Sequence, residues 1–376
     1  MLTKRIKIQA WMHKNQYHAR SVVQILFLAL VMLIGVRFWW FVEQIEKGVW
    51  PGFERPPGVE AFLPISALVS LKHFLFTGTI NTIHPSALVL FIIICMTAVI
   101  AKKSFCSWIC PFGLLSEFFN KLNRYIYKKS LFLPLWMDLP LRSVKYLIAG
   151  FFIWSIFYNM PMDSIELFIQ SPYNRFADIK MLRFFTQISI TGLITILVLC
   201  FLSIIIQNFW CRYLCPYGAL LGIISFLSIG RIKRNKVNCT KCGKCEQHCP
   251  GLIHIRQKDQ IHSSECTACM SCINHCPEKN AIGFSLFSGK LPITQAALGF
   301  VLVLLFTTGI FMAKSSGNWQ NTVSKNEYFR YGIQSRLSLN GKAQIDPQKM
   351  EKMMEMMKQM EAQKSKVKSS SKRKGD

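Results

Sequence analysis

Long apolar runs, separated by polar and basic segments, dominate the pattern of this 376-residue chain. A helix needs about 20 mostly apolar residues to cross the hydrocarbon core of a membrane. The runs that approach this length are residues 22–42, 86–101, 144–158, 184–206 and 293–313. A further run at 59–78 contains Pro64 and Lys72, so we expect it to lie at the membrane interface. The pattern therefore predicts a mostly α fold, a polytopic bundle of about five transmembrane helices.

The composition agrees with a membrane protein. Hydrophobic residues make up 51% of the chain, yet 45 Lys and Arg stand against 19 Asp and Glu. A basic excess can indicate nucleic-acid binding, but no nucleic-acid recognition motif accompanies it. Basic loops beside long apolar runs are typical of membrane proteins. We therefore expect a membrane as a partner and no nucleic acid. The first apolar run is too long for a signal peptide and lacks a cleavage site, so we expect it to be retained.

The distribution of basic residues predicts the orientation in the membrane. Residues 1–20, 102–145 and 212–292 hold five, eight and eleven basic residues, well above their acidic ones. Basic loops stay on the cytoplasmic side of a membrane, so these three segments are predicted to be cytoplasmic. The tail 314–376, with fourteen basic residues, would then be exported, which conflicts with a simple charge rule.

Two cysteine motifs of identical spacing lie between the last two predicted spans. The segments CTKCGKCEQHCP (239–250) and CTACMSCINHCP (266–277) both read C-x2-C-x2-C-x3-C-P. This is the bacterial ferredoxin pattern, in which the fourth cysteine of each motif ligates the other cluster. We therefore predict two [4Fe–4S] clusters in an inserted α+β ferredoxin-like domain. The predicted ligands are Cys239, Cys242, Cys245 and Cys276 for cluster 1, and Cys266, Cys269, Cys272 and Cys249 for cluster 2.

Zinc and disulfides are the alternative uses of these eight cysteines. Zinc sites use separated C-x2-C pairs, and disulfides are rare in a reducing cytoplasm, so neither fits as well. His248 and His275 precede the last cysteine of each motif. Because each predicted cluster already has four thiolates, we expect these histidines to be polar neighbours and not ligands. His73 and His84 flank the outer end of the second predicted span and could hydrogen-bond a quinone carbonyl, but we expect both to be solvated or interfacial.

A second cysteine motif, C-x3-C-P, occurs twice in the apolar half of the chain. CSWICP (106–111) and CRYLCP (211–216) are 105 residues apart, and each follows a predicted span, which indicates a parallel internal repeat. Residues i and i+4 share one face of a helix. We therefore expect the four cysteines, Cys106, Cys110, Cys211 and Cys215, to converge. A tetrathiolate metal site, a redox-active dithiol system and simple packing all remain open.

The two motif types together resemble the membrane-bound polyferredoxin family of the NapH and YccM type, which is related to the membrane core of NosR and CcoG. The resemblance covers most of residues 20–290. It implies a protein of the bacterial inner membrane that passes electrons between the quinone pool, or a redox partner protein, and the clusters. Such a protein could act as a quinol dehydrogenase-like subunit, with quinone as a further cofactor.

Two cofactors are not expected, and two other functions remain open. Residues 44–82 are too few for the flavin domain of NosR-type relatives, so no covalent flavin is expected. The chain has no C-x2-C-H motif, which argues against c-type haem. The alternative functions are a metal-handling or maturation factor, which would reduce or transfer copper for an oxidase or reductase, and a redox-sensing regulator.

The predicted domain organisation follows from these motifs. The four-span membrane core with both C-x3-C-P motifs comes before the ferredoxin domain, and a fifth helix and a tail come after it. The tail reads as a Met-rich helix with a basic, low-complexity end. We expect the helix to dock a partner, and the alternative is binding of Cu(I) by the methionine thioethers. The predicted parts are a cytoplasmic N-terminus (1–20), the membrane core (21–230), the ferredoxin domain (231–290), the fifth helix (291–313) and the tail (314–376).

Overall fold

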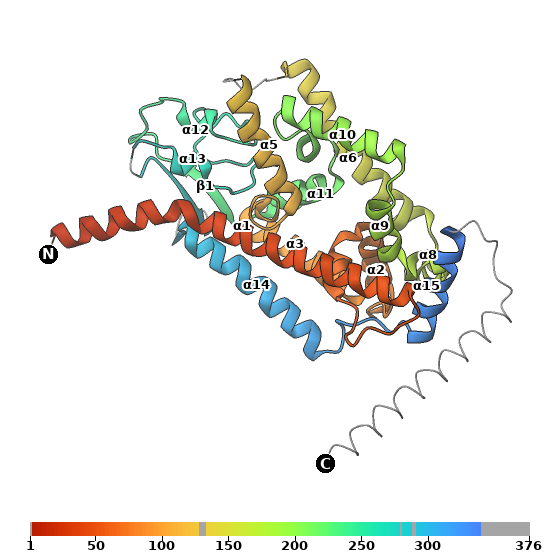
Figure 1. Cartoon of the computed structure of the whole chain (residues 1–376). Coiled ribbons are helices and arrows are strands. Elements are labelled where there is room, and N and C mark those ends of the chain that lie inside the picture. Colours follow the sequence, from red (N-terminus) through yellow and green to blue (C-terminus); the bar gives the residue numbers. More distant parts are fainter. Residues whose placement is uncertain (1, 128–132, 279, 288–290, 340–376) are drawn as a thin grey trace, which may run out of the picture.

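The computed structural model describes residues 2–127, 133–278, 280–287 and 291–339 (Figure 1). Helices make up most of it, and a small sheet lies at one end, close to the first half of α1. The predicted Met-rich helix lies outside the described residues. The first helices and 3-10 turns are α1 (Leu2–Glu46), η1 (Pro57–Phe62), α2 (Pro64–Thr77), α3 (Pro85–Ala101), α4 (Ser104–Trp108) and α5 (Pro111–Tyr127).

The second part of the helical region repeats the order of the first, a long apolar helix followed by a short turn and a proline-initiated helix. The proline of each C-x3-C-P motif is the first residue of the helix that follows it, where a missing N–H costs nothing. These elements are α6 (Leu135–Trp154), η2 (Ser155–Asn159), α7 (Met162–Gln170), α8 (Pro172–Arg175), α9 (Ala177–Thr186), α10 (Ile190–Ile205), η3 (Trp210–Leu214), α11 (Pro216–Ile224) and η4 (Ser225–Leu227).

Three described helices are long and apolar enough to cross a membrane. They cover Ala19–Glu46 within α1, Trp136–Asn159 through α6 and η2, and Gln295–Ser315, which is α14. Three of the predicted spans fall within them. The predicted span at 86–101 corresponds to α3, which has 17 residues and is shorter than the usual crossing length. The predicted count of five spans is therefore not confirmed.

The predicted span at 184–206 is not one continuous helix. α9 ends at Thr186, α10 begins at Ile190, and the two are bent by 80°. Ser189 is the N-cap of α10, and its Oγ accepts a hydrogen bond from the N–H of Gly192 at 3.1 Å. The pair could form one broken span, which would raise the number of candidate spans from three to four.

The region of the ferredoxin-type motifs combines a sheet with short helices. β1 pairs antiparallel with β2, from Gly230 opposite Leu286 to Arg234 opposite Ile282, and β2 pairs antiparallel with β3. The chain then enters α14. The elements are β1 (Gly230–Arg234), α12 (Lys244–Gln247), α13 (Ser271–Asn274), β2 (Ile282–Leu286), β3 (Leu291–Pro292), α14 (Gln295–Ser315) and α15 (Lys325–Leu339).

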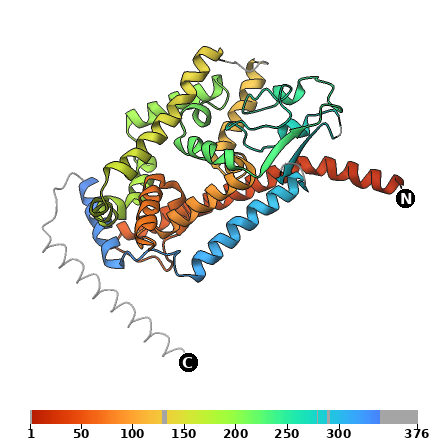
Figure 2. The same cartoon turned by 180° about the vertical axis from the view of Figure 1, so that it is seen from behind.

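One hydrophobic core joins this region to the helices. Trp108 of α4 and Leu302 of α14, both fully buried, belong to the same cluster of buried side chains as Ile255 and Phe284. A second core, around Phe41 of α1, lies at the opposite end, where α15 packs (Figure 2). The ferredoxin-type region is therefore packed against the helices and is not a separate body.

Large apolar side chains are exposed along the candidate membrane helices. Leu33 of α1 and Phe311 of α14 are 66% and 71% exposed, and Phe201 of α10 is 62% exposed. Soluble proteins seldom expose apolar surface of this extent, so these faces suit contact with lipid.

Candidate metal centre

The two ferredoxin-type motifs fold into the same loop. The residue directly before the second cysteine of each motif, Lys241 or Ala268, has a positive φ of 56° or 47°. The residue after the second cysteine, Gly243 or Met270, also has a positive φ, of 79° or 58°. Left-handed backbone at both places turns the chain tightly between successive cysteines. Each loop then starts a one-turn helix, α12 or α13, which carries the third cysteine.

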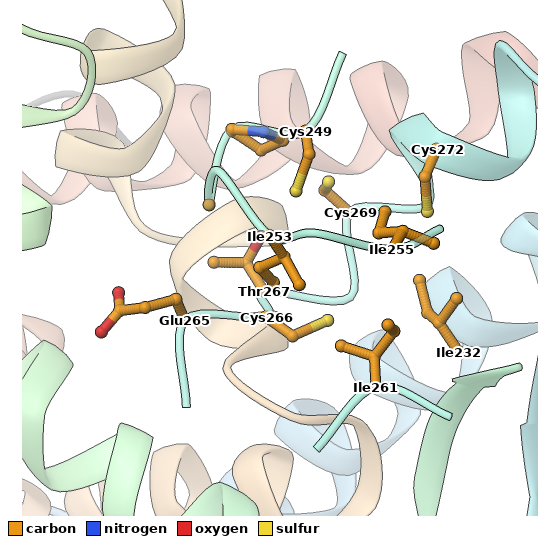
Figure 3. Close-up of a pocket in the computed structure, with 12 residues that line it drawn as sticks. Ile232, Cys249, Ile253, Ile255, Ile261, Glu265, Cys266, Thr267, Cys269 and Cys272 are labelled. Carbon is orange, nitrogen blue, oxygen red and sulfur yellow. The ribbon is translucent and has the colours of Figure 1, made fainter. Parts of the chain in front are cut away.

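A cavity is lined by Cys266, Cys269 and Cys272 of the second motif and by Cys249 of the first (Figure 3). Figure 3 shows the four sulfur atoms turned toward one space, while the carboxylate of Glu265 points away from it. The rest of the wall is apolar and is formed by Ile232, Ile253, Ile255 and Ile261. These four cysteines are the set that the ligand spacing predicts for cluster 2.

The second cavity has the same construction with the motifs exchanged. It is lined by Cys239, Cys242 and Cys245 of the first motif and by Cys276 of the second. This is the set that the spacing predicts for cluster 1. Arg256 and Lys241 also lie at its wall, and Cys242 is exposed.

Four thiols around one space fit an iron–sulfur cubane, which takes one thiolate on each of its four irons. Among the described residues, no three His, Cys, Asp or Glu side chains are grouped as a single bound metal ion requires. The arrangement therefore favours clusters over the zinc alternative.

The surroundings of the two cavities differ in burial and charge. Burial raises the pKa of the Cys249 thiol to about 12 and that of Cys266 to about 11. At the other cavity, the backbone N–H of Lys241 lowers the pKa of Cys239, and the guanidinium of Arg234 lowers it further. The cysteines of one cavity are thus all buried, whereas most of those at the other are partly or fully exposed, and Lys241, Arg256 and Glu278 lie at its wall.

His248 and His275 stack on each other between the two short helices. Their ring centroids are 3.7 Å apart, and the planes are within 15°. Each Nδ1 lies 2.9 Å from the carbonyl oxygen four residues earlier, that of Lys244 or Ser271. The histidines therefore join the two motifs side by side, which agrees with their expected role as polar neighbours.

The two C-x3-C-P motifs also have matching local structure. Cys215 precedes α11, and its Sγ accepts the N–H of Gly218 at 3.3 Å. The backbone N–H of Gly113 acts in the same way on Cys110, which precedes α5. Gly113 must be glycine, because an added Cβ would lie 1.8 Å from the carbonyl oxygen of Cys106.

The four C-x3-C-P cysteines interact with one another. Burial raises the pKa of Cys106 to about 12, opposed by Lys103, and the Cys110 and Cys215 sulfurs raise it further. Burial likewise raises the pKa of Cys211 well above its usual range, and the other three sulfurs add to this effect. The structure therefore places the four cysteines within electrostatic range of one another, which agrees with the convergence that the repeat predicts.

Both C-x3-C-P segments touch the loops that surround the buried cavity. Within the first motif, Ser107 Oγ donates to the carbonyl of Thr267 at 2.7 Å, and Trp108 Nε1 donates to that of Ala268 at 3.1 Å. At the second motif, Arg212 donates to the carbonyl of Gly251 at 2.9 Å. Asn208 Nδ2 donates to the carbonyl of Pro250 at 2.7 Å. The first repeat thus contacts the Cys266–Cys269 loop, and the second contacts the turn after Cys249.

Buried charges lie at the same boundary. Glu265 is bound by Lys103 at 3.2 Å and by Lys145 at 2.6 Å. Burial raises the pKa of Glu265, but the two lysines outweigh this effect and bring it down to about 2. Asp138 pairs with buried Arg212 at 3.0 Å.

Sequence reasoning missed these boundary residues. Lys103 directly precedes the first C-x3-C-P motif, Arg212 lies inside the second, and Glu265 directly precedes Cys266. Charged residues beside cysteine motifs in an otherwise apolar chain were the available signal.

His73 and His84, which precede the predicted span at 86–101, differ in burial. His73 is half-buried at the surface of α2, and its Nδ1 lies 3.2 Å from the carbonyl oxygen of Thr79. The expectation of a solvated or interfacial His84 is wrong, because its side chain is fully buried. Its ring nitrogens lie 3.1 Å from Glu60 Oε1 and 2.6 Å from the carbonyl oxygen of Asn174. Both nitrogens are thus engaged within the protein.

Two families match the chain. The family described as "4Fe-4S binding domain" matches residues 83–129 and again residues 188–236. The family described as "4Fe-4S dicluster domain" matches residues 231–277. The first family therefore matches once around each C-x3-C-P motif, in agreement with the internal repeat, and the second covers both ferredoxin-type motifs.

YccM of Escherichia coli K12, which is named as an electron transport protein, is 39% identical over 323 residues, or 84% of this chain and 90% of YccM. The chain belongs to the YccM family. The resemblance to membrane-bound polyferredoxins is thereby confirmed.

More distant relatives of this family member include other ferredoxin-type proteins. The ferredoxin-type protein NapH of Haemophilus influenzae is 27% identical over 46% of this chain and 57% of its own length. The regulatory protein NosR of Pseudomonas aeruginosa is 26% identical over 54% of this chain and 28% of its own. No solved structure matches the chain at a significant level. The chain is an iron–sulfur electron-transport protein with candidate membrane helices.

Proposed function

We propose that this protein passes electrons between the quinone pool, or a membrane redox partner, and two [4Fe–4S] clusters in the region 231–290. The ligands are the two sets of four cysteines that line the two cavities. Each cluster supplies a site that takes up or releases one electron at a time. The remaining residues hold the clusters in place and set their surroundings.

The contacts of the buried cavity carry this proposal. Both C-x3-C-P segments, which follow the apolar helices α3 and α10, hydrogen-bond to loops that hold ligands of cluster 2. Cys242 of cluster 1 is exposed instead. The order of transfer is therefore membrane side, cluster 2, cluster 1 and soluble partner, or the reverse.

The chain's own residues support this order. Trp108 and the four isoleucines of the buried cavity exclude water from cluster 2. Lys241 lies at the wall of the exposed cluster beside Glu278 and Arg256, which is paired with Glu246, and the charge of Lys241 favours the reduced, more negative form. We place this region on the cytoplasmic side of a bacterial inner membrane, on the strength of the basic loops around it.

A redox titration of the reconstituted protein tests the proposal. The anaerobically purified full chain, inserted into vesicles, is treated with a short-chain quinol while EPR follows the clusters. We expect the cubane signals to be reduced and reoxidised in step with the quinol/quinone ratio. If the signals respond to dithionite but not to any quinol, the quinone pool is not the electron source or sink, and the proposal fails in that part.

A deletion strain separates the alternative functions. A metal-handling factor would leave quinol oxidation intact in membranes but would leave a copper enzyme without metal. A regulator would change transcript levels with the redox state of its clusters. Loss of quinol-dependent cluster reduction, with copper enzymes and transcripts unchanged, is the outcome that electron transfer predicts.

A further inference from the structure

The four C-x3-C-P cysteines have no part in the two clusters proposed above. They come from two segments 105 residues apart, yet their sulfurs act on one another electrostatically. Each pair precedes a proline-initiated helix, and at the first pair Gly113 lets the chain pass close to Cys106, whereas at Gly218 an added Cβ would meet only ordinary contacts, the nearest at 3.4 Å. Such duplicated placement of four thiols exceeds what packing of small side chains requires.

Burial raises the pKa of Cys110 and Cys215, but backbone N–H groups at both sulfurs act in the opposite direction and favour a thiolate. Backbone N–H groups of Phe112 and Gly113 point at Cys110, and those of Tyr217 and Gly218 point at Cys215. The helices that follow, α5 and α11, have 17 and nine residues. Amides and a helix N-terminus both stabilise negative charge on the sulfur. Hydrogen bonds to cysteine sulfur are also a means by which proteins tune iron–sulfur clusters.

The buried charges at this boundary leave an excess of positive charge. Lys103 and Lys145, exposed by only 3% and 0%, share the single carboxylate of Glu265. Both lysines act electrostatically on Cys215, and Lys103 also acts on Cys106. An uncompensated buried charge is costly. Cluster 2, whose ligand Cys266 is acted on by Lys103, supplies part of the balancing negative charge, and a negative group at Cys106 and Cys215 would add to it on the other side of the lysines. Four thiols or two disulfides are neutral, whereas four thiolates around an iron–sulfur core carry net negative charge.

We propose that the four C-x3-C-P cysteines together bind a third [4Fe–4S] cluster, beside cluster 2. This deepens the proposed function, because the third cluster becomes the step between cluster 2 and the membrane side. The "4Fe-4S binding domain" family supports it, since its two matches include both C-x3-C-P motifs and end before Cys239, the first ferredoxin-type cysteine.

The test is an iron and acid-labile sulfide count on the full chain, purified anaerobically in detergent. We expect about twelve iron atoms per chain, since each cubane holds four. The double substitution Cys110→Ser and Cys215→Ser should lower the count by about four and remove one EPR component, while the signals of clusters 1 and 2 remain. The control is Cys95→Ser with Cys200→Ser, a repeat-related pair in α3 and α10, which should keep the full count.

The outcomes separate the possibilities. A count of about eight in the unaltered chain, unchanged by the double substitution, overturns the third cluster, and it needs no variant to fold. Alkylation and mass spectrometry that find the four cysteines in disulfides overturn it in favour of a dithiol system. Loss of one zinc or copper in place of iron also overturns it. None of these results depends on quinol, so failure here is distinct from failure of the proposed function.

Discussion

The two cavities of the ferredoxin-type region have the same ligand pattern but different surroundings. The cavity of cluster 2 is walled by isoleucines and covered by α4, and its cysteines are buried. Cys242 in the cavity of cluster 1 is exposed, and Lys241, Arg256 and Glu278 lie at the wall of that cavity. The same loop has therefore been placed once with buried cysteines and once with largely exposed ones.

The difference shows that local sequence builds a cluster site and tertiary contacts decide what the site is used for. Solvent exposure and hydrogen bonds to sulfur are main determinants of cluster potential. Two clusters with the same ligands should accordingly titrate separately. The predictions below test this asymmetry, from the largest expected effect to the smallest.

Removal of one cysteine ligand from each cavity should show the largest difference in stability between the two cluster sites. Cys272→Ser should lose cluster 2. Because Cys272 is 5% exposed and lies in the main core, the substitution should also lower the free energy of unfolding by more than ~4 kcal/mol. Cys242→Ser should lose cluster 1 with a smaller loss, because Cys242 is exposed. Iron content and thermal denaturation in detergent measure both effects. Equal losses of stability would contradict the asymmetry.

Removal of a carboxylate near each cavity should show the same contrast. Glu265→Gln leaves the buried Lys103 and Lys145 without their shared partner, which should cost about 3–5 kcal/mol. The control is Glu246→Gln near cluster 1, whose partner Arg256 is half exposed, where we expect about 0–1 kcal/mol. Denaturant titration of the two variants in detergent gives the difference. Similar costs would mean that Glu265 is accessible to water in the folded chain.

Ligand spacing was enough to predict the two groups of four cysteines that line the cavities. In the ferredoxin pattern the fourth cysteine of each motif ligates the cluster of the other motif, and this places Cys249 with the second motif and Cys276 with the first. Periodicity was likewise enough for the helices at 22–42 and 293–313, where long apolar runs leave few alternatives. The convergence of the C-x3-C-P cysteines followed from their repetition.

The contacts that distinguish the cavities could not be predicted in this way. Trp108 and Ala268 are 160 residues apart, and no local pattern says that α4 covers the second loop and not the first. The break between α9 and α10 was hidden in a continuous apolar run, because a single serine cap decided it. His84 looked interfacial, since its partners Glu60 and Asn174 come from distant segments.

The hydrogen bond from α4 to the cluster 2 loop should have a moderate effect. Trp108→Phe keeps an aromatic ring in the core but leaves the carbonyl of Ala268 without its 3.1 Å donor. We expect a loss of about 1–3 kcal/mol and a shift in the midpoint of cluster 2 alone. Trp136→Phe is the control, since Trp136 is 76% exposed. An equal shift of both clusters in an EPR-monitored redox titration would show that α4 does not act on cluster 2 specifically.

Substitution of the stacked histidines should have the smallest effect on stability, and this effect should be similar for the two clusters. His248 and His275 occupy equivalent positions in the two motifs and stack on each other. The variants His248→Phe and His275→Phe each keep an aromatic ring in the stack. Each variant loses one hydrogen bond, to the carbonyl of Lys244 or of Ser271. Each substitution should cost about 0.5–1.5 kcal/mol. Because the stack joins the two motifs, both variants should release iron from the two clusters at similar rates under a chelator. Faster loss from cluster 1 in one variant only would show that the exposed half controls the stability of the pair.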